Sequence, residues 1–106
     1  MDDRYPVPDM ADVRLVTVLG AVADPIRLQI VRDLADGLPH AKSEEAWAFE
    51  VNKSTMAHHY TTLRLAGLTR TTVTGRSHAI QLRRAELDAR FPGLVEALVA
   101  GHDPVS

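Results

Sequence analysis

The sequence predicts a mainly α-helical domain that carries one small β-hairpin and pairs with a second copy of itself through its terminal helices. Three observations support this prediction. Apolar side chains recur at spacings of three and four residues in several stretches, as in helices with one buried face. Two β-rich runs flank a glycine, which is typical of an antiparallel hairpin. The first and last helical stretches carry more apolar surface than so short a chain needs for its own core.

An arm and a first helix are predicted at the N-terminal end. Residues 1–8 contain two prolines and are expected to form a flexible arm. Over residues 9–22 the apolar side chains follow helical spacing. They form one face, made of Met10, Val13, Val16, Leu19 and Ala23.

A second helix is predicted to begin at Pro25. Asp24 is a typical N-cap residue, and proline is favoured at the first helical position. Gly37 is expected to end the helix in the left-handed conformation that glycine tolerates. Arg27 and Arg32 lie off the apolar stripe of this helix, so we expect both side chains to be solvated.

Two capped helices are predicted in the middle of the chain. Ser43, with two glutamates after it, is the expected start of a short helix that Trp47 helps to anchor. Asn52 is the expected N-cap of a longer helix from Lys53 to about Ala66. The inner face of the longer helix is marked by Met56, Tyr60 and Leu63.

A hairpin and a last helix complete the predicted domain. Residues 68–73 and 78–82 are the expected strands, and residues 74–77, which include a glycine, join them. The apolar residues of 86–100 follow helical spacing again. Pro92 lies near the start of that stretch, so we expect the helix to kink or split there.

The order of these elements is that of a winged helix-turn-helix. A helix, a tight turn and a second helix occupy about residues 43–67, and the hairpin over about 68–83 stands where the wing follows. In such a domain the second helix presents small polar and basic side chains to the major groove of DNA. Away from its inner stripe, the helix from Lys53 carries basic, small or hydroxylic side chains and no acidic one.

Charge is distributed unevenly along the chain. Residues 51–85 contain six Lys or Arg and no Asp or Glu. The other residues hold all 14 carboxylates, so the formal net charge of the whole chain is −2. A nearly neutral total therefore conceals a cationic segment that is expected to form one surface attractive to a polyanion such as DNA.

Two segments resemble the ArsR/SmtB winged-helix repressors of bacteria. One is residues 24–27 (Asp-Pro-Ile-Arg), and the other is residues 51–68 followed by 74–76 (Thr-Gly-Arg). The resemblance covers about residues 10–100. It implies a regulator that binds a palindromic operator as a dimer, represses transcription and often leaves DNA when an inducer binds. It assigns DNA binding to Lys53, Ser54, Thr55, Ala57, His58, Thr61, Thr62, Arg64, Gly75 and Arg76, and a place at the back of the recognition helix to His59.

The resemblance also implies how two copies pair. Terminal helices form the interface in that family, which agrees with the spare apolar surface of residues 9–22 and 86–100. Two recognition helices would then lie about one helical turn of DNA apart, ~34 Å. The expected interface residues are Val13, Val16, Leu19, Phe91, Leu94, Val95 and Leu98.

No enzymatic activity, cofactor or metal ion is predicted. The chain has no cysteine. His58 and His59 are adjacent, so they point about 100° apart on a helix and cannot share an ion as an i, i+4 pair would. A metal site completed across a dimer, by His102, Asp103 and the partner's Asp12, stays open. Ser54 and His58 lie four residues apart on one face of the 53–66 helix, but the sequence positions no third group that would make them a catalytic site.

Two alternative functions remain beside the repressor. One is a winged-helix module whose basic face docks an acidic protein, and the other is a metal-responsive repressor. No apolar run approaches the length of a membrane span and residues 1–8 lack a secretory signal, so a cytoplasmic protein is expected, associated with the bacterial nucleoid when bound. Residues 9–101 form the expected domain and 102–106 a tail. The expected partners are double-stranded DNA, a second copy and, if a ligand relieves repression, a small-molecule inducer.

Overall fold

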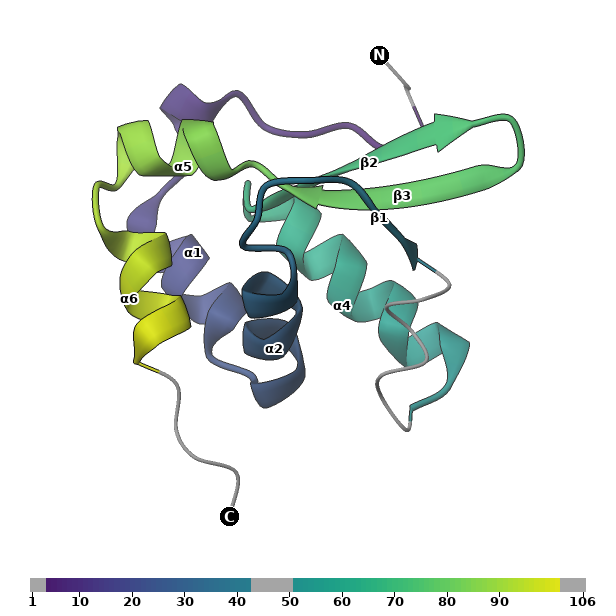
Figure 1. The fold of residues 1–106 in the computed structure, drawn as a ribbon, viewed down its shortest axis with the longest axis horizontal. Helices are drawn as coiled ribbons and strands as arrows, with labels where there is room; N and C mark the ends of the chain where they lie inside the picture. The colour runs from purple at the N-terminus through teal and green to yellow at the C-terminus, as the bar shows by residue number, and fades with distance from the viewer. Residues whose placement is uncertain (1–3, 43–50, 102–106) are drawn as a thin grey trace.

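The computed structural model describes residues 4–42 and 51–101. Over these residues the fold is mixed α/β, with five α-helices, one short 3₁₀ helix and a three-stranded antiparallel sheet (Figure 1). The elements in chain order are η1 (Met10–Asp12), α1 (Leu15–Val22), α2 (Pro25–Asp33), β1 (His40–Ala41), α4 (Lys53–Leu65), β2 (Thr69–Thr74), β3 (Ser77–Leu82), α5 (Arg84–Arg90) and α6 (Leu94–Ala100).

The elements surround one hydrophobic core. The β2–β3 hairpin lies over the C-terminal part of α4 and extends past it, whereas α1, α5 and α6 gather at the opposite end of the molecule (Figure 1). Side chains from every helix and from the hairpin meet in the core, and those that are completely buried include Val18, Ile30, Leu34, Leu63, Ile80, Leu87 and Val95. The core therefore fixes α4 from behind.

The first predicted helix is interrupted. Asp9 caps η1 by accepting a hydrogen bond from an amide of that turn at 3.0 Å, and Val13 is then extended before α1 begins. The Val13 side chain is only 3% exposed and lies against Gly67, while its carbonyl accepts a hydrogen bond from Arg90 at 3.1 Å. The prediction of one continuous helix is wrong because the contact with Gly67, far along the chain, buries Val13 in an extended conformation.

The second helix begins where its sequence signals predict and ends earlier than expected. The Asp24 carboxylate accepts hydrogen bonds from the Ile26 and Arg27 amides at 2.8 and 3.0 Å, so it satisfies two of the free donors of the first turn. After α2 the chain turns at Gly37, whose φ of 75° is rare for any residue other than glycine. The predicted start is confirmed, but the predicted end is wrong: α2 ends at Asp33 with Leu34 as its C-cap, and a further turn, closed by the Gly37 amide donating to the Leu34 carbonyl at 3.0 Å, precedes the glycine.

The two arginines of α2 are held by the protein and are less solvated than expected. Arg27 Nε donates to the Ala21 carbonyl at 2.6 Å, which ties α2 to the end of α1. Arg32 Nη1 donates to the Gln29 side chain at 3.1 Å, and its Nε is buried. Both side chains are half-buried, so the expectation of solvation is met only in part: a backbone carbonyl accepts from Arg27 and a side-chain amide from Arg32.

The α4 helix has strong signals at both ends. Asn52 Oδ1 accepts a hydrogen bond from the Thr55 amide at 2.8 Å. At the other end Gly67 has a φ of 95°, and the Leu68 amide donates to the Leu63 carbonyl at 3.0 Å. This is a Schellman-type ending, which brings Leu68 back into the core. The predicted helix from Lys53 to about Ala66 is confirmed.

The hairpin is confirmed, and the sheet has a strand that the sequence analysis missed. Strands β2 and β3 pair from Thr69↔Leu82 to Thr74↔Ser77, so the turn consists of Gly75 and Arg76 alone. On the other side of β3, His40 pairs with Ile80. His40 is half-buried in β1. A two-residue strand is too short for any periodicity to show.

The C-terminal helix splits as predicted. Leu87 accepts the last hydrogen bond of α5 from the Phe91 amide at 2.8 Å. Pro92 and Gly93 follow, and Gly93 has a φ of 83° that starts α6 in a new direction. Two short helices therefore replace the single stretch 86–100, and α5 begins two residues earlier than expected.

Three predictions concern residues that the structure does not describe. They are the short helix from Ser43, which is the first helix of the predicted helix-turn-helix, the tail 102–106, and the first three residues of the arm. The described remainder agrees with a winged helix in its element order. No helix in the described ranges combines the length and the apolar character needed to cross a membrane.

Candidate nucleic-acid interface

The inner face of α4 fastens the helix to the core. Met56, Tyr60 and Leu63 are 2%, 8% and 0% exposed, as the sequence predicts. Each fully buried aliphatic or aromatic side chain of this size contributes about 2 kcal/mol of burial free energy. The helix therefore cannot rotate about its axis without exposing this stripe, and its outward residues are held in a fixed orientation.

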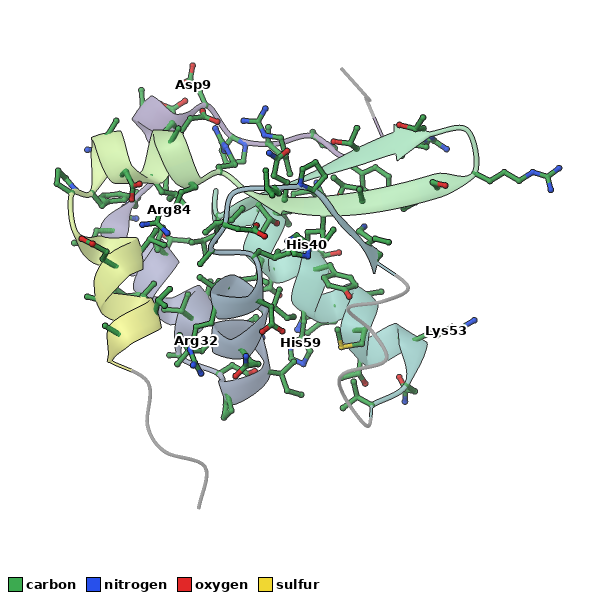
Figure 2. All side chains as sticks on the ribbon, in the orientation of Figure 1. Asp9, Arg32, His40, Lys53, His59 and Arg84 are labelled. Atoms are coloured by element: carbon green, nitrogen blue, oxygen red, sulfur yellow. The ribbon has the colours of Figure 1, made fainter. Side chains whose placement is uncertain are left out.

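A second contact fixes α4 from behind. His59 is 7% exposed and lies between α4 and α2 (Figure 2). Its Nδ1 is 3.2 Å from Arg27 Nη1, and a guanidinium can only donate, so Nδ1 accepts and the ring carries its proton on Nε2. Arg27 also donates to the Ala21 carbonyl. One arginine thus joins the corner between α1 and α2 to the back of α4, where the resemblance places His59.

The outward face of α4 is small, polar and cationic. Its exposed residues recur along one side of the helix, and Lys53 points away from the body of the molecule (Figure 2). The first turn contains no acidic residue. The exposed residues among those predicted to bind DNA are Lys53, Ser54, Ala57, His58 and Thr61, whereas Thr55, Thr62 and Arg64 are half-buried at the edges of this face.

The wing carries the other predicted contacts. Gly75 and Arg76 are exposed at the hairpin tip, and the tip and the N-terminal end of α4 reach toward the same side of the molecule (Figure 1). Gly75 has a φ of 62°, which the first residue of a type II′ turn requires. The turn therefore presents Arg76 at the outermost point of a stiff two-stranded ribbon.

The expectation of one cationic surface over residues 51–85 is wrong for half of its charges. Arg70 and Arg83 both form ion pairs with Glu86, and Arg84 forms one with Asp88 at 2.9 Å. The two carboxylates lie on α5, just beyond the acid-free segment. Among the described residues, no carboxylate pairs with the remaining three cations, which are Lys53, Arg64 and Arg76.

Glu86 is the centre of the paired cluster. Hydrogen bonding to Arg83 is the largest influence on its carboxyl group, and together with the charges of Arg83 and Arg70 it outweighs desolvation and holds the Glu86 pKa below its usual value. Arg83 is 5% exposed and also donates to the Pro8 carbonyl at 2.9 Å. These arginines therefore join α5, the sheet and the N-terminal arm to one another, which is a structural role.

Residues of the N-terminal arm contact the interface. Arg64 Nη1 donates to the Pro6 carbonyl at 2.6 Å, and the Tyr5 hydroxyl lies 3.2 Å from His78 Nδ1 on β3. Carbonyl groups beside prolines are good acceptors for arginines, and this pairing leaves no periodic trace in a sequence. Arg64 is consequently held along the arm and does not extend outward like Lys53.

Three residues next to the predicted site were missed. Tyr5, Lys42 and His78 border the same side of α4, and the Lys42 ammonium lies 4.7 Å from the centre of the Tyr5 ring and 5.3 Å from that of Tyr60. Burial, followed by repulsion from Arg64, holds the Lys42 pKa below its usual value. Lys42 is the one lysine outside the acid-free segment, which is why its charge was not assigned to this face.

The residues expected at a dimer interface fall into three groups by their exposure. Val16 and Leu19 are 63% and 45% exposed on α1, next to the equally exposed Leu15. Val13 and Val95 instead lie in the core of this single chain, where they support the surface from within. The half-buried members of the expected set are Phe91, Leu94 and Leu98.

In the described part of the chain, no group of three His, Asp or Glu side chains is arranged to hold a metal ion.

Comparison with known proteins connects this arrangement to a characterised kind of domain. No protein-family model matches the chain. The chain is 33% identical over 82 residues to the uncharacterized HTH-type transcriptional regulator YceK of Bacillus subtilis (strain 168). The aligned region covers 76% of this chain and 82% of that protein.

Proposed function

The chain belongs to the helix-turn-helix transcriptional regulators, and we propose that it binds double-stranded DNA as a homodimer and represses transcription at a two-fold symmetric operator. In the finer detail of its sequence it resembles the ArsR/SmtB group. The observation that carries the proposal is the outward face of α4, which is rigidly supported, exposed and free of carboxylates over its described residues.

The chemistry of this face suits a major groove. Lys53 and His58 can donate to guanine acceptors, Ser54 and Thr61 can donate or accept, and Ala57 is small enough to meet a thymine methyl group. Thr55, Thr62 and Arg64 would contact the backbone beside the groove. Since the helix cannot turn about its axis, these groups would meet the duplex in one register.

The wing would add a backbone or minor-groove contact. Arg76 at the tip is the third cation of residues 51–85, beside Lys53 and Arg64, that no described carboxylate pairs with. A dimer with three phosphate-neutralising cations per subunit should lose affinity with a slope of about −5 in log K against log salt concentration. This slope counts none of the paired arginines, because Glu86 and Asp88 offset two of their three charges and hold all three guanidinium groups against α5.

Pairing of two copies would use the end of the molecule opposite the wing. Exposed Leu15, Val16 and Leu19 form an apolar patch on α1, and α6 lies at the same end (Figure 1). A patch of this kind on a small domain is typical of an interface. Two copies joined there would carry their wings at the two outer ends, which suits a symmetric operator.

The experiment that tests the function is the selection of bound sites from random DNA, followed by fluorescence anisotropy on the selected duplex. We expect a palindromic site, and His58→Ala should change the preferred base at one symmetric pair of positions. Arg14→Ala, a change at an exposed residue outside the proposed DNA interface, is the matched control. Folded protein that retains no DNA at low salt would contradict the proposal and favour a module that docks an acidic protein.

The dimer is tested separately by sedimentation. Leu19→Glu places a charge in the α1 patch and should convert a dimer into a monomer. Leu38→Glu is the control, because Leu38 is 60% exposed but lies outside α1. A wild-type chain that sediments as a monomer at tens of micromolar would contradict the dimer while leaving DNA binding by the single domain open to its own test.

A further inference from the structure

A hollow lies between α4, the hairpin and the N-terminal arm. Its volume is about 670 Å³, within the range of sites for small organic molecules. Met56, Ala57 and the ring of Tyr60 come from α4, and the ring of Tyr5 comes from the arm. We call it the arm groove, and its other lining residues are Lys42, Lys53, Thr61, Arg64, Thr71 and His78.

The described charges of the arm groove have one sign. Lys42, Lys53 and Arg64 line it, and none of the lining residues that the structure describes is acidic. Lys42 is half-buried, with its ammonium near the faces of both tyrosine rings, and the Arg64 guanidinium carbon is 5.7 Å from the centre of the Tyr5 ring. Two partly desolvated cations therefore share one space without a described carboxylate between them, and an anion placed there would relieve their repulsion.

The rest of the lining favours an apolar body. Met56 and Tyr60 are mostly buried, and the carbon atoms that they do expose form part of the wall together with Ala57. The Tyr5 hydroxyl is already engaged with His78, and the Tyr60 hydroxyl donates to the Lys42 carbonyl at 3.4 Å, so the two rings offer mainly their carbon surfaces. Rings and aliphatic groups with a few placed cations are the usual pattern of a site for an amphipathic anion.

We propose that the arm groove binds a small organic carboxylate with an apolar body, whose carboxylate lies between Lys42 and Arg64, and that its binding releases DNA. The second part rests on the proposed function. Lys53, Ala57, Thr61 and Arg64 line the groove and are also proposed to face the duplex. A molecule held there occupies the space beside α4 and neutralises cations that would otherwise meet phosphates, so ligand and DNA exclude each other.

The direct test measures binding of two probes to the free protein by calorimetry and by ¹H–¹⁵N chemical-shift mapping. The probes are 2-naphthoate and biphenyl-4-carboxylate, each compared with its uncharged primary alcohol. We expect the acids to bind with shifts at Tyr5, Tyr60 and His78, and the alcohols to bind at least about tenfold more weakly. Absence of binding by both acids at 10 mM (roughly the weakest affinity that this method detects), or equal binding by the alcohols, overturns the proposal.

Variants locate the site. Lys42→Met keeps the length of the side chain and removes its charge, so it should weaken the acids about tenfold. Tyr5→Ala removes one wall and should weaken acids and alcohols alike. Arg14→Met, a charge removed elsewhere, should change neither. Thermal denaturation of each variant shows that it is folded, and a folded Lys42→Met protein that binds the acids as tightly as wild type contradicts the assignment of Lys42.

Competition on DNA then separates this proposal from the function on which it rests. The acids should displace the selected duplex from wild type, and the same concentration should displace it much less from Lys42→Met. If no duplex is ever bound, the proposed function fails while probe binding can still stand. If Lys42→Met weakens DNA as strongly as it weakens the acids, Lys42 serves a DNA phosphate and the ligand proposal is overturned.

Discussion

Two groups of arginine and lysine that look alike in the sequence differ in what they face. Lys53, Arg64 and Arg76 have no carboxylate partner among the described residues, and two of them are exposed. Arg70, Arg83 and Arg84 pair with Glu86 and Asp88 at the start of α5. The difference teaches that a cationic segment is not a cationic surface: charge counted along a chain becomes a binding signal only after the nearest carboxylates in space are known.

The strongest way to separate the two groups is to remove the buried member of the paired group. Arg83→Met should lower the free energy of unfolding by about 2–3 kcal/mol, because it loses charge-assisted hydrogen bonds to Glu86 and a bond to the Pro8 carbonyl. Urea denaturation measures the change, with the exposed Arg14→Met as control. Unchanged stability would show that the Arg83 contacts with α5 and the arm do not hold the fold together.

The unpaired group is tested by a double variant of its two most exposed cations. Lys53→Ala with Arg76→Ala should weaken binding to the selected duplex by about thirtyfold at low salt and reduce the salt slope from about −5 to about −2, while stability changes by less than about 0.5 kcal/mol. Anisotropy titrations at several salt concentrations provide both numbers. A slope that stays at its wild-type value would remove these cations from the interface.

A smaller effect is expected from the exposed side of the paired group. Arg84 donates to Asp88 at 2.9 Å and to the Ala35 carbonyl at 2.8 Å, and it is partly solvated. Arg84→Met should therefore lower stability by about 1 kcal/mol and leave DNA affinity within about twofold. The comparison fails if this variant affects DNA as strongly as the loss of an unpaired cation.

The smallest expected effect is the dependence of the paired cluster on pH. The hydrogen bond from Arg83 holds the folded-state pKa of Glu86 below its ordinary value of 4.5. Ionised Glu86 therefore stabilises the folded protein fully above pH 4.5, and this stabilisation is lost as the pH falls through the lower folded-state pKa. Urea denaturation of wild type and Glu86→Gln should show a stability difference at pH 6 that narrows below about pH 4. A difference that widens in acid would reverse the assigned sign.

The sequence predicts those parts of the fold whose causes are local. Asn52 and Gly67 bound α4, Gly75 forms the hairpin turn and Pro92 with Gly93 splits the last helix, and each acts through its own backbone within a few residues. The inner stripe of α4 follows from its periodicity. Of the exposed face, the residue types were predictable, and so was their shared side of the helix.

The remaining features depend on contacts between distant residues. Val13 is extended because it packs on Gly67, β1 exists because β3 offers an open edge, and Arg64 turns toward Pro6. Lys42 reaches the interface from outside the acid-free segment. No pattern in the neighbouring residues marks any of these contacts, so they could not be predicted from the sequence alone.

One glycine makes the fold unusually sensitive at a position remote from the exposed face. A methyl carbon added at Gly67 would lie 2.3 Å from Val13 Cγ2, and the φ of 95° already disfavours any side chain. In a genetic screen for colonies that lose repression, replacements of Gly67 should therefore be recovered alongside those of Lys53 and His58. Such variants would lose repression because Val13 is displaced and the end of α4 is disrupted. They should therefore not be interpreted as residues that contact bases of the operator.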